Sequence, residues 1–214
     1  IRESAFAYCT SIKSIVLPKN LKTIGEKAFE GCGIQRMDIP DSVTEIGKEC
    51  FFLSSLRSVK LPRKLQEINE ATFLRCGLES IDLPDSLEKI GSRAFSDCNF
   101  LKSIHIPSSV SEIGASAFED CRSLAKITVD KDNLYFRSEK NALIRKSDNA
   151  VIAVANAEQP DIMIPVGVKR IESGAICNKE NLKSIILSEG LQEVEAHTFN
   201  GCSELTSVII PKTV

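Results

Sequence analysis

The 214-residue sequence contains no tryptophan and only two tyrosines, so it lacks most of the rings on which nucleic-acid bases or sugars stack. An excess of charge of one sign is also missing, because 27 Lys and Arg stand against 29 Asp and Glu. A surface with so small a net charge does not attract polyanions, and we expect no nucleic-acid partner. No run of about 18 apolar residues occurs, so we expect no membrane insertion within this chain.

Clusters that carry chemistry are missing as well. The eight cysteines include no C-x-x-C pair, which a zinc site would need. The glycines are isolated and form no phosphate-binding loop. The two histidines, His105 and His197, lie far apart, and no Ser/His/Asp or Cys/His set is suggested. The sequence therefore predicts no catalytic, cofactor-binding or metal-binding residue, and a chain that is not an enzyme.

What the sequence does contain is one repeat, present many times. Pro18, Pro40, Pro62 and Pro84 follow one another at a constant interval, and Pro107 comes one position later than that interval would place it. Each unit reads L-x-x-I-x-[LI]-P-x-x-[LV]-x-x-I-G-x-x-A-F-x-x-C. A short, nearly fixed period is typical of a solenoid, in which every unit buries its apolar side against its neighbours. We therefore predict that residues 1–214 form a single solenoid of about nine rungs. Because the chain begins and ends inside a repeat, we expect it to be a fragment of a longer array.

Within a unit, apolar and polar residues alternate before the proline, as in Leu78–Pro84, which predicts a strand. Stacked units would place these strands in one parallel sheet with right-handed crossovers, while the other side would carry short extended or turn segments and little helix. We expect glycines such as Gly91 to adopt an unusual backbone angle, and Gly33 and Gly77 to permit tight corners. The predicted strands are 12–17, 34–39, 56–61, 78–83, 101–106, 124–129, 161–164, 182–187 and 205–210.

The period is broken once, because the interval from Asp130 to Pro165 is much longer than one repeat. Two β-rich runs in this interval flank Ser147-Asp148-Asn149, which predicts an inserted β-hairpin at about 142–154.

Phenylalanine and cysteine recur at fixed places in the repeat. The phenylalanines predict a buried spine, and the cysteines predict reduced thiols that fill the core as small hydrophobic groups. Neighbouring rungs would bring cysteine Cα atoms within the range of a disulfide, but parallel Cβ atoms would stay slightly too far apart for an unstrained bridge. The phenylalanine column is Phe6, Phe29, Phe51, Phe73, Phe95, Phe118 and Phe199.

The template resembles the BspA-like, treponemal-type leucine-rich repeats. The segments that carry the resemblance are LPKNLKTIGEKAFEGC at 17–32, LPDSLEKIGSRAFSDC at 83–98 and IPSSVSEIGASAFEDC at 106–121. The resemblance implies a right-handed leucine-rich-repeat superhelix of the β-α type with a parallel sheet on its concave face. It also implies a secreted or cell-surface protein used in adhesion and protein binding, with a protein partner such as a host extracellular or surface protein.

The outward positions of the predicted strands are where we expect function, because inward positions are fixed by packing. Asp38, Lys60 and Asp82, with His105, alternate in sign, which indicates either a ladder of charge pairs or recognition of a partner by basic side chains. At the same outward position, later repeats carry the apolar residues Met163, Ile186 and Ile209. These residues form either a binding patch or a surface covered by the hairpin or by further repeats. The candidate partner-binding residues are Arg36, Arg57, Lys60, His105, Met163, Ile186 and Ile209.

The sequence therefore predicts a non-catalytic protein-binding or adhesion module that recognises its partner along the concave face and needs no cofactor. The alternative is a structural spacer or stalk that displays another domain. The sequence leaves the ligand and the oligomeric state open.

Overall fold

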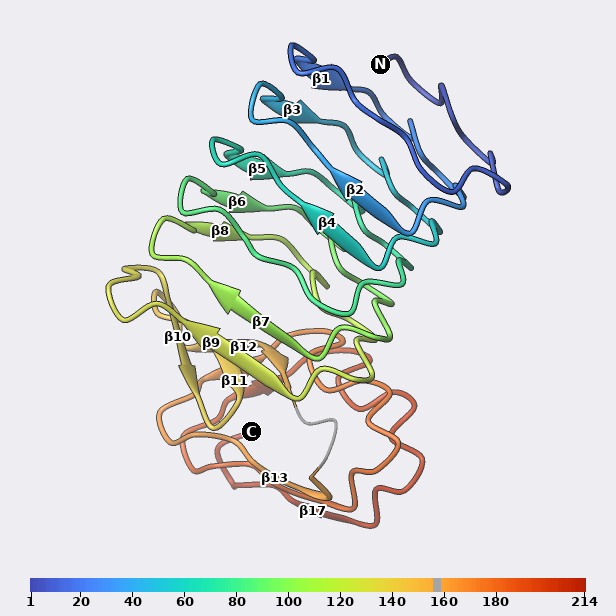
Figure 1. The fold of residues 1–214 in the computed structure, drawn as a ribbon. Helices are drawn as coiled ribbons and strands as arrows, with labels where there is room; N and C mark the ends of the chain where they lie inside the picture. The colour runs from blue at the N-terminus through green and yellow to red at the C-terminus, as the bar shows by residue number, and fades with distance from the viewer. Residues whose placement is uncertain (156–158) are drawn as a thin grey trace.

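The chain is described from a computed structural model that places residues 1–155 and 159–214. It winds into stacked turns that run from the N-terminus to the C-terminal end (Figure 1). The described residues form strands and turns, and none of them is helical. The fold is thus a parallel β-solenoid whose convex side is built from extended and turn segments, as the repeat predicts.

One face of the solenoid carries the strands that precede the prolines. They pair in parallel as β2 with β4, β7 with β9, and β13 with β15 and β17, so the predicted single sheet is in fact three separate sheets. Their bounds are β2 Arg36–Asp38, β4 Ser58–Lys60, β7 Ser103–Ile106, β9 Lys126–Val129, β13 Asp161–Met163, β15 Ser184–Ile186 and β17 Ser207–Ile209.

The strands predicted over 12–17 and 78–83 are wrong, because neither segment forms a strand. At 78–83 the backbone amide of Glu79 donates to Arg57 O at 3.2 Å, and Lys102 N donates to Glu79 O at 3.3 Å. Both bonds involve Glu79, at the start of the segment, and no backbone hydrogen bond to a neighbouring turn is found for the described residues 80–83. The sheet is therefore interrupted between β4 and β7, close to the point where the repeat becomes longer.

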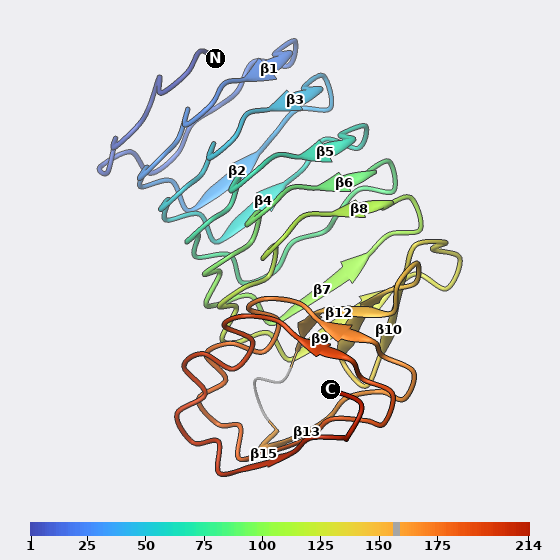
Figure 2. The same cartoon turned by 180° about the vertical axis from the view of Figure 1, so that it is seen from behind.

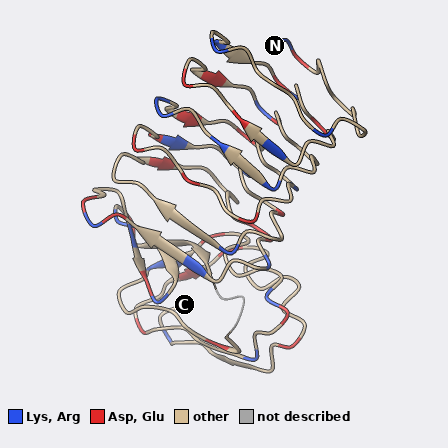
Figure 3. Cartoon of the chain, in the orientation of Figure 1, with Lys and Arg blue, Asp and Glu red and all other residues tan. Residues whose placement is uncertain are grey.

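The convex side carries a second line of two-residue strands, whose isoleucine or valine points inward and whose first residue is polar. Lys89 in this line lies 3.4 Å from both Glu67 and Glu112, on the strands before and after it, and the alternation of sign is visible in Figure 3. Such exposed pairs add little stability. These strands are β1 Thr23–Ile24, β3 Glu45–Ile46, β5 Glu67–Ile68, β6 Lys89–Ile90, β8 Glu112–Ile113, β14 Arg170–Ile171 and β16 Glu193–Val194.

The glycine that follows the isoleucine is not there for its backbone angle. Gly47 and Gly91 do not adopt positive φ, so that expectation is wrong. A Cβ at Gly47 would lie 2.4 Å from Glu26 N, and one at Gly91 would lie 2.6 Å from Glu70 N. The glycine allows the neighbouring turn to approach closely. Asn69 stands in the repeat position of this glycine, and there the line of convex strands is interrupted between β3 and β5. Asn69 Nδ2 donates to Ile46 O at 2.7 Å.

The third side of each turn carries a small residue followed by phenylalanine, or by Ile176 in one turn, between two residues with left-handed backbone, most of them not glycine. Lys27 and Gly31 flank one pair (φ 53° and 58°), and Arg93 and Asp97 flank another (55° and 57°). Hydrogen bonds between turns hold these residues in a conformation that L-residues rarely adopt.

The phenylalanine rings stack along this side and confirm the predicted spine. From Phe6 to Phe118, successive ring centroids lie 5.3 to 5.7 Å apart and the planes are within 11° of parallel. Phe199 packs against a separate core near the C-terminal end.

The segment that breaks the period is a three-stranded antiparallel meander of β10 Phe136–Glu139, β11 Ala142–Arg145 and β12 Ala150–Val154. It then continues through β12 into a parallel pair with β14. Leu143 and Ile152 pack in the N-terminal core, whereas Ile144 and Val151 pack in the C-terminal core. Both views of the ribbon place these strands between the two sets of turns (Figures 1 and 2). The predicted hairpin corresponds to β11 and β12, and the meander that contains it is a buried partition between the two sets of turns.

Two glycines in the same repeat position should respond differently to substitution. A Cβ at Gly33 would lie 2.0 Å from Thr10 O, whereas one at Gly77 would lie 3.5 Å from Leu56 O. We expect Gly33→Ala to lower the free energy of unfolding by about 1–3 kcal/mol or more. Gly77→Ala should be neutral or stabilising by up to about 1 kcal/mol, because neither residue has positive φ. Urea unfolding of the two variants checks this, and equal losses would contradict it.

Candidate functional site

The polar part of the outward face lies on β2, β4 and β7. Arg36, Lys60 and His105 are exposed there. Asp38 is the register neighbour of Lys60, but the ion pairs found among the described residues join neither of them to a partner. His105 Nδ1 instead lies 2.9 Å from Thr128 Oγ1 on β9. The predicted ladder of charge pairs is therefore not formed, and Arg36 and Lys60 keep their charged heads in solvent.

Arg57 does not lie on this face. It precedes β4 at the rim of the sheet, and its guanidinium is 3.9 Å from Glu79 in an exposed ion pair. Arg57 directly precedes Ser58, the register neighbour of Arg36, but its side chain pairs with Glu79 rather than with a residue of the strand face.

The apolar part lies on the C-terminal sheet. Met163, Ile186 and Ile209 occupy one register row across β13, β15 and β17. Their side chains are 48%, 37% and 56% exposed. We call these three residues the apolar strip. An ordered row of apolar groups on an open sheet is the kind of surface that proteins use for binding.

The meander does not cover the apolar strip, because its strands are buried between the two cores. Only its tight turn reaches the edge of the strip, where Lys140 Nζ lies 3.1 Å from Met163 Sδ. The alternative that the hairpin shields this patch is therefore wrong. The strip remains accessible in the described structure and carries a lysine at one end.

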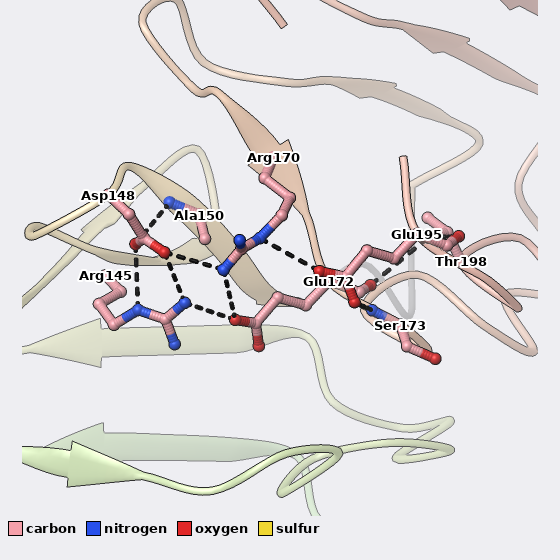
Figure 4. Close-up of polar contacts among 8 residues, drawn as sticks. All are labelled: Arg145, Asp148, Ala150, Arg170, Glu172, Ser173, Glu195 and Thr198. Atoms are coloured by element: carbon pink, nitrogen blue, oxygen red, sulfur yellow. Dashed lines mark hydrogen bonds and ion pairs between the residues drawn. The ribbon is translucent and has the colours of Figure 1, made fainter. Parts of the chain in front are cut away.

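A network of charged side chains fixes the meander to the turns that carry the strip (Figure 4). Arg145 binds Asp148 through two hydrogen bonds of 2.7 and 3.0 Å, and its Nη2 also lies 2.6 Å from Glu172. Arg170 lies 2.9 Å from Asp148 and 3.1 Å from Glu195. The hydrogen bond from Arg145 lowers the pKa of Asp148. Since the network joins β11, β14 and the residue after β16, it holds three turns in register.

All eight cysteines are free thiols, and six of them are buried as predicted, whereas Cys202 is half-buried and Cys9, on the N-terminal turn, is exposed. Besides filling space, several donate to a carbonyl of the preceding turn: Cys76 Sγ to Phe51 O at 2.8 Å, and Cys98 Sγ to Phe73 O at 3.1 Å. Burial raises the pKa of Cys76 to about 12. Because the thiolate is the reactive form, these residues are poor nucleophiles at neutral pH. The donor role was not predicted, although serine, which is also a donor, fills the same position at Ser54.

Lys179 occupies the position where other repeats have cysteine, and sequence reasoning gave it no role. It is 7% exposed, and burial lowers its pKa. Around it the turns before and after the meander stack directly, with Arg122 Nη1 2.6 Å from Glu180 Oε1 and Cys177 Sγ 3.4 Å from Asp120 Oδ1. The lysine therefore marks the junction between the two halves of the solenoid.

Two further properties concern only residues 1–155 and 159–214. They contain no group of three or more His, Cys, Asp or Glu placed to hold a metal ion. They also contain no helix with the length and apolarity needed to cross a membrane.

The turns stack in parallel, and their strands and adjoining segments bury leucine and isoleucine side chains. These features define the class of leucine-rich repeat proteins. The family model described as "BspA type Leucine rich repeat region" matches six copies, over residues 1–99, 66–142 and 153–214. The chain therefore belongs to the BspA-type leucine-rich repeat family. A comparison with curated proteins finds no match.

Solved bacterial structures share the fold. The pneumococcal vaccine antigen PcpA superposes with a TM-score of 0.77 at 22% identity, over 100% of this chain and 64% of that one. A leucine-rich cell surface protein from Faecalibacterium prausnitzii gives 0.69 at 26%, over 98% and 57%. The leucine-rich repeat protein of T. pallidum gives 0.58 at 28%, over 90% and 77%. The chain thus spans less than two thirds of the length of the first two.

Proposed function

We propose that the chain is a non-catalytic protein-binding module of a secreted or cell-surface protein, and that its partner docks on the outward face of β13, β15 and β17. The observation that carries this proposal is the apolar strip. Three side chains that cost free energy to expose lie side by side on a rigid sheet, and no described segment covers them. Their burial against a partner would recover that free energy.

Rigidity favours this role. The backbone ladder and the network around Arg145 fix the strip before a partner arrives, so little side-chain or loop ordering is left for binding to impose. The basic side chains Arg36 and Lys60 would add steering toward an acidic surface at the other end of the molecule. The similarity to the Faecalibacterium protein supports a place at the cell surface.

Binding should be lost when the apolar strip becomes charged. We expect Ile186→Asp to weaken binding by at least about tenfold, because a carboxylate buried against an apolar partner would be unpaired. The melting temperature should change by less than about 2 °C, because the residue lies on the surface. The measurement uses the whole chain against an array of host extracellular proteins, followed by titration of the protein that binds.

Glu193→Lys is the matched control, since Glu193 is exposed on the convex side of the same turn. It should leave affinity unchanged. A large loss of stability in Ile186→Asp would show that the strip belongs to the core. Failure to bind any protein of the array, or binding that survives Ile186→Asp, would favour the alternative of a spacer.

A further inference from the structure

A cleft lies at the rim of the N-terminal sheet, apart from the apolar strip. It measures about 290 Å³ and is lined by Gln35, Ser55, Arg57, Gly77, Glu79 and Phe100, among others. A second hollow shares Gly77 and Phe100 and continues toward Arg75, Asp97 and Asn99. Phe100 stands between the two and is 62% exposed. We call this pair of hollows the Phe100 cleft.

The cleft arises where the repeat becomes longer by a single position. At the corner before the strand, the three preceding turns have one residue, Gly33, Ser55 or Gly77, whereas this turn has two, Asn99 and Phe100, as the first turn has at Thr10 and Ser11. The extra residue leaves Phe100 outside the stack, and the glycine one turn earlier leaves a gap beside it. The change from one corner residue to two thus creates a step in the rim at Phe100.

Gly77 is not required by the fold. Its backbone has no positive φ, and an added Cβ would make only ordinary contacts at 3.5 Å or more. Gly33, in the same repeat position, would clash with Thr10 O at 2.0 Å. The one corner glycine that could carry a side chain is the one that forms the floor of the Phe100 cleft.

The polar groups around the cleft include both donors and acceptors. Arg57 and Glu79 are 3.9 Å apart and more than half exposed, so their pairing is weak and each can bind a ligand. In the second hollow, Asn99 Oδ1 is buried and has no hydrogen-bond partner among the described residues, and buried acceptors are normally paired. Donors and acceptors that surround an aromatic ring match the amide N–H and C=O groups of a polypeptide.

The size of the cleft limits its occupant. At about 290 Å³ it lies at the lower edge of small-molecule sites, which span about 300–1,000 Å³. We propose that the Phe100 cleft binds an extended segment of a protein partner, which inserts one aromatic or aliphatic side chain between Phe100 and Gly77. The backbone amides of the bound segment then contact Arg57, Glu79 and Gln35. This inference deepens the proposed function, since it gives the protein-binding module a second, peptide-like contact.

The test selects random dodecapeptides, displayed on phage, on the whole chain and measures the Kd of the enriched peptides in synthetic form. We expect a shared aromatic or aliphatic residue. Gly77→Leu, which fills the cleft, and Phe100→Ser, which removes its wall, should each weaken binding by at least about tenfold. Phe100→Tyr keeps the ring and should bind like the wild type. Thermal melting of each variant verifies that it is folded.

Ile186→Asp separates this inference from the proposed function. Cleft-binding peptides should be indifferent to it. Peptides that lose affinity in Ile186→Asp but not in Gly77→Leu would overturn the cleft and leave the apolar strip as the binding site. The cleft proposal would also be overturned if no peptide were enriched, or if both cleft variants bound the peptides as the wild type does. The protein array would still test the apolar strip independently.

Discussion

Asn133→Ala is expected to lower the free energy of unfolding by about 3–4 kcal/mol. Asn133 is 1% exposed. Its Nδ2 donates to Pro107 O at 2.7 Å and to Val110 O at 2.9 Å, and its Oδ1 accepts from Tyr135 N at 2.8 Å and Phe136 N at 2.7 Å. One amide thus satisfies four backbone groups at the point where the chain enters the meander. Alanine would leave all four without this partner.

Urea unfolding followed by circular dichroism measures this loss. Asn20→Ala is the matched control, because Asn20 is exposed in the corresponding loop of an earlier repeat, and it should change stability by no more than about 0.5 kcal/mol. A loss for Asn133→Ala as small as that of the control would show that the meander is positioned by its apolar contacts alone.

Phe73→Ala should cost about 3–5 kcal/mol. Phe73 is fully buried, and its ring stacks between Phe51 at 5.4 Å and Phe95 at 5.5 Å. The neighbouring rings cannot close the gap, because backbone bonds such as that from Phe73 N to Ala94 O, at 2.9 Å, fix the spacing of the turns. The cavity therefore persists in the middle of the column.

The chain offers graded controls for this substitution. Phe6 ends the column and is partly exposed, so Phe6→Ala should cost less than Phe73→Ala. Phe100 lies outside the column, and Phe100→Ala should stay within about 0.5 kcal/mol of the wild type. The same urea unfolding series ranks the three variants. If Phe73→Ala were no more costly than Phe100→Ala, the stacked rings would not be the spine of the fold.

The spine and the strands were within reach of the sequence because both follow from periodicity alone. A residue type that recurs once in every repeat must stack in a solenoid, and inward alternation identifies the strands that precede the prolines. The failures at 12–17 and 78–83 concern hydrogen bonding rather than chain path. At Glu79 the chain still bonds to both neighbouring turns, but the residues that follow it form no ladder.

The backbone was harder to foresee. Gly91 suggested an unusual dihedral angle, yet its role is to let the backbone of the preceding turn approach, which depends on a contact with the repeat before it. Conversely, Lys27 and Arg93 do adopt left-handed backbone, and nothing in these residue types signals it. Bonds between turns impose that conformation. Contacts of this kind exist only after the repeats have stacked.

The meander shows the same limit. Its β-rich runs and its turn at Ser147-Asp148-Asn149 indicated paired strands, but pairing alone does not say what covers them. β10 escaped notice, since Phe136–Glu139 carries little strand pattern. The burial of both faces of β11 and β12 could have been suspected from their unbroken apolar runs, which are typical of strands covered on both sides.

Of the candidate site, the sequence located the apolar strip but not the Phe100 cleft. Met163, Ile186 and Ile209 occupy equivalent positions of successive repeats, so their adjacency follows from the period. The sequence shows the change from one corner residue to two at Asn99 and Phe100, but the hollow beside Phe100 is seen only in the structure. A role of either surface in binding remains a prediction.

Site-specific photo-crosslinking to the array-identified protein tests the central claim, that the outward face of the C-terminal sheet is where a protein binds. A benzophenone amino acid replaces Ile186 in one variant and Glu193, on the opposite side of the same turn, in another. We predict a covalent adduct from position 186 and none from position 193. Adducts from position 193 alone, or equally from both, would contradict the account.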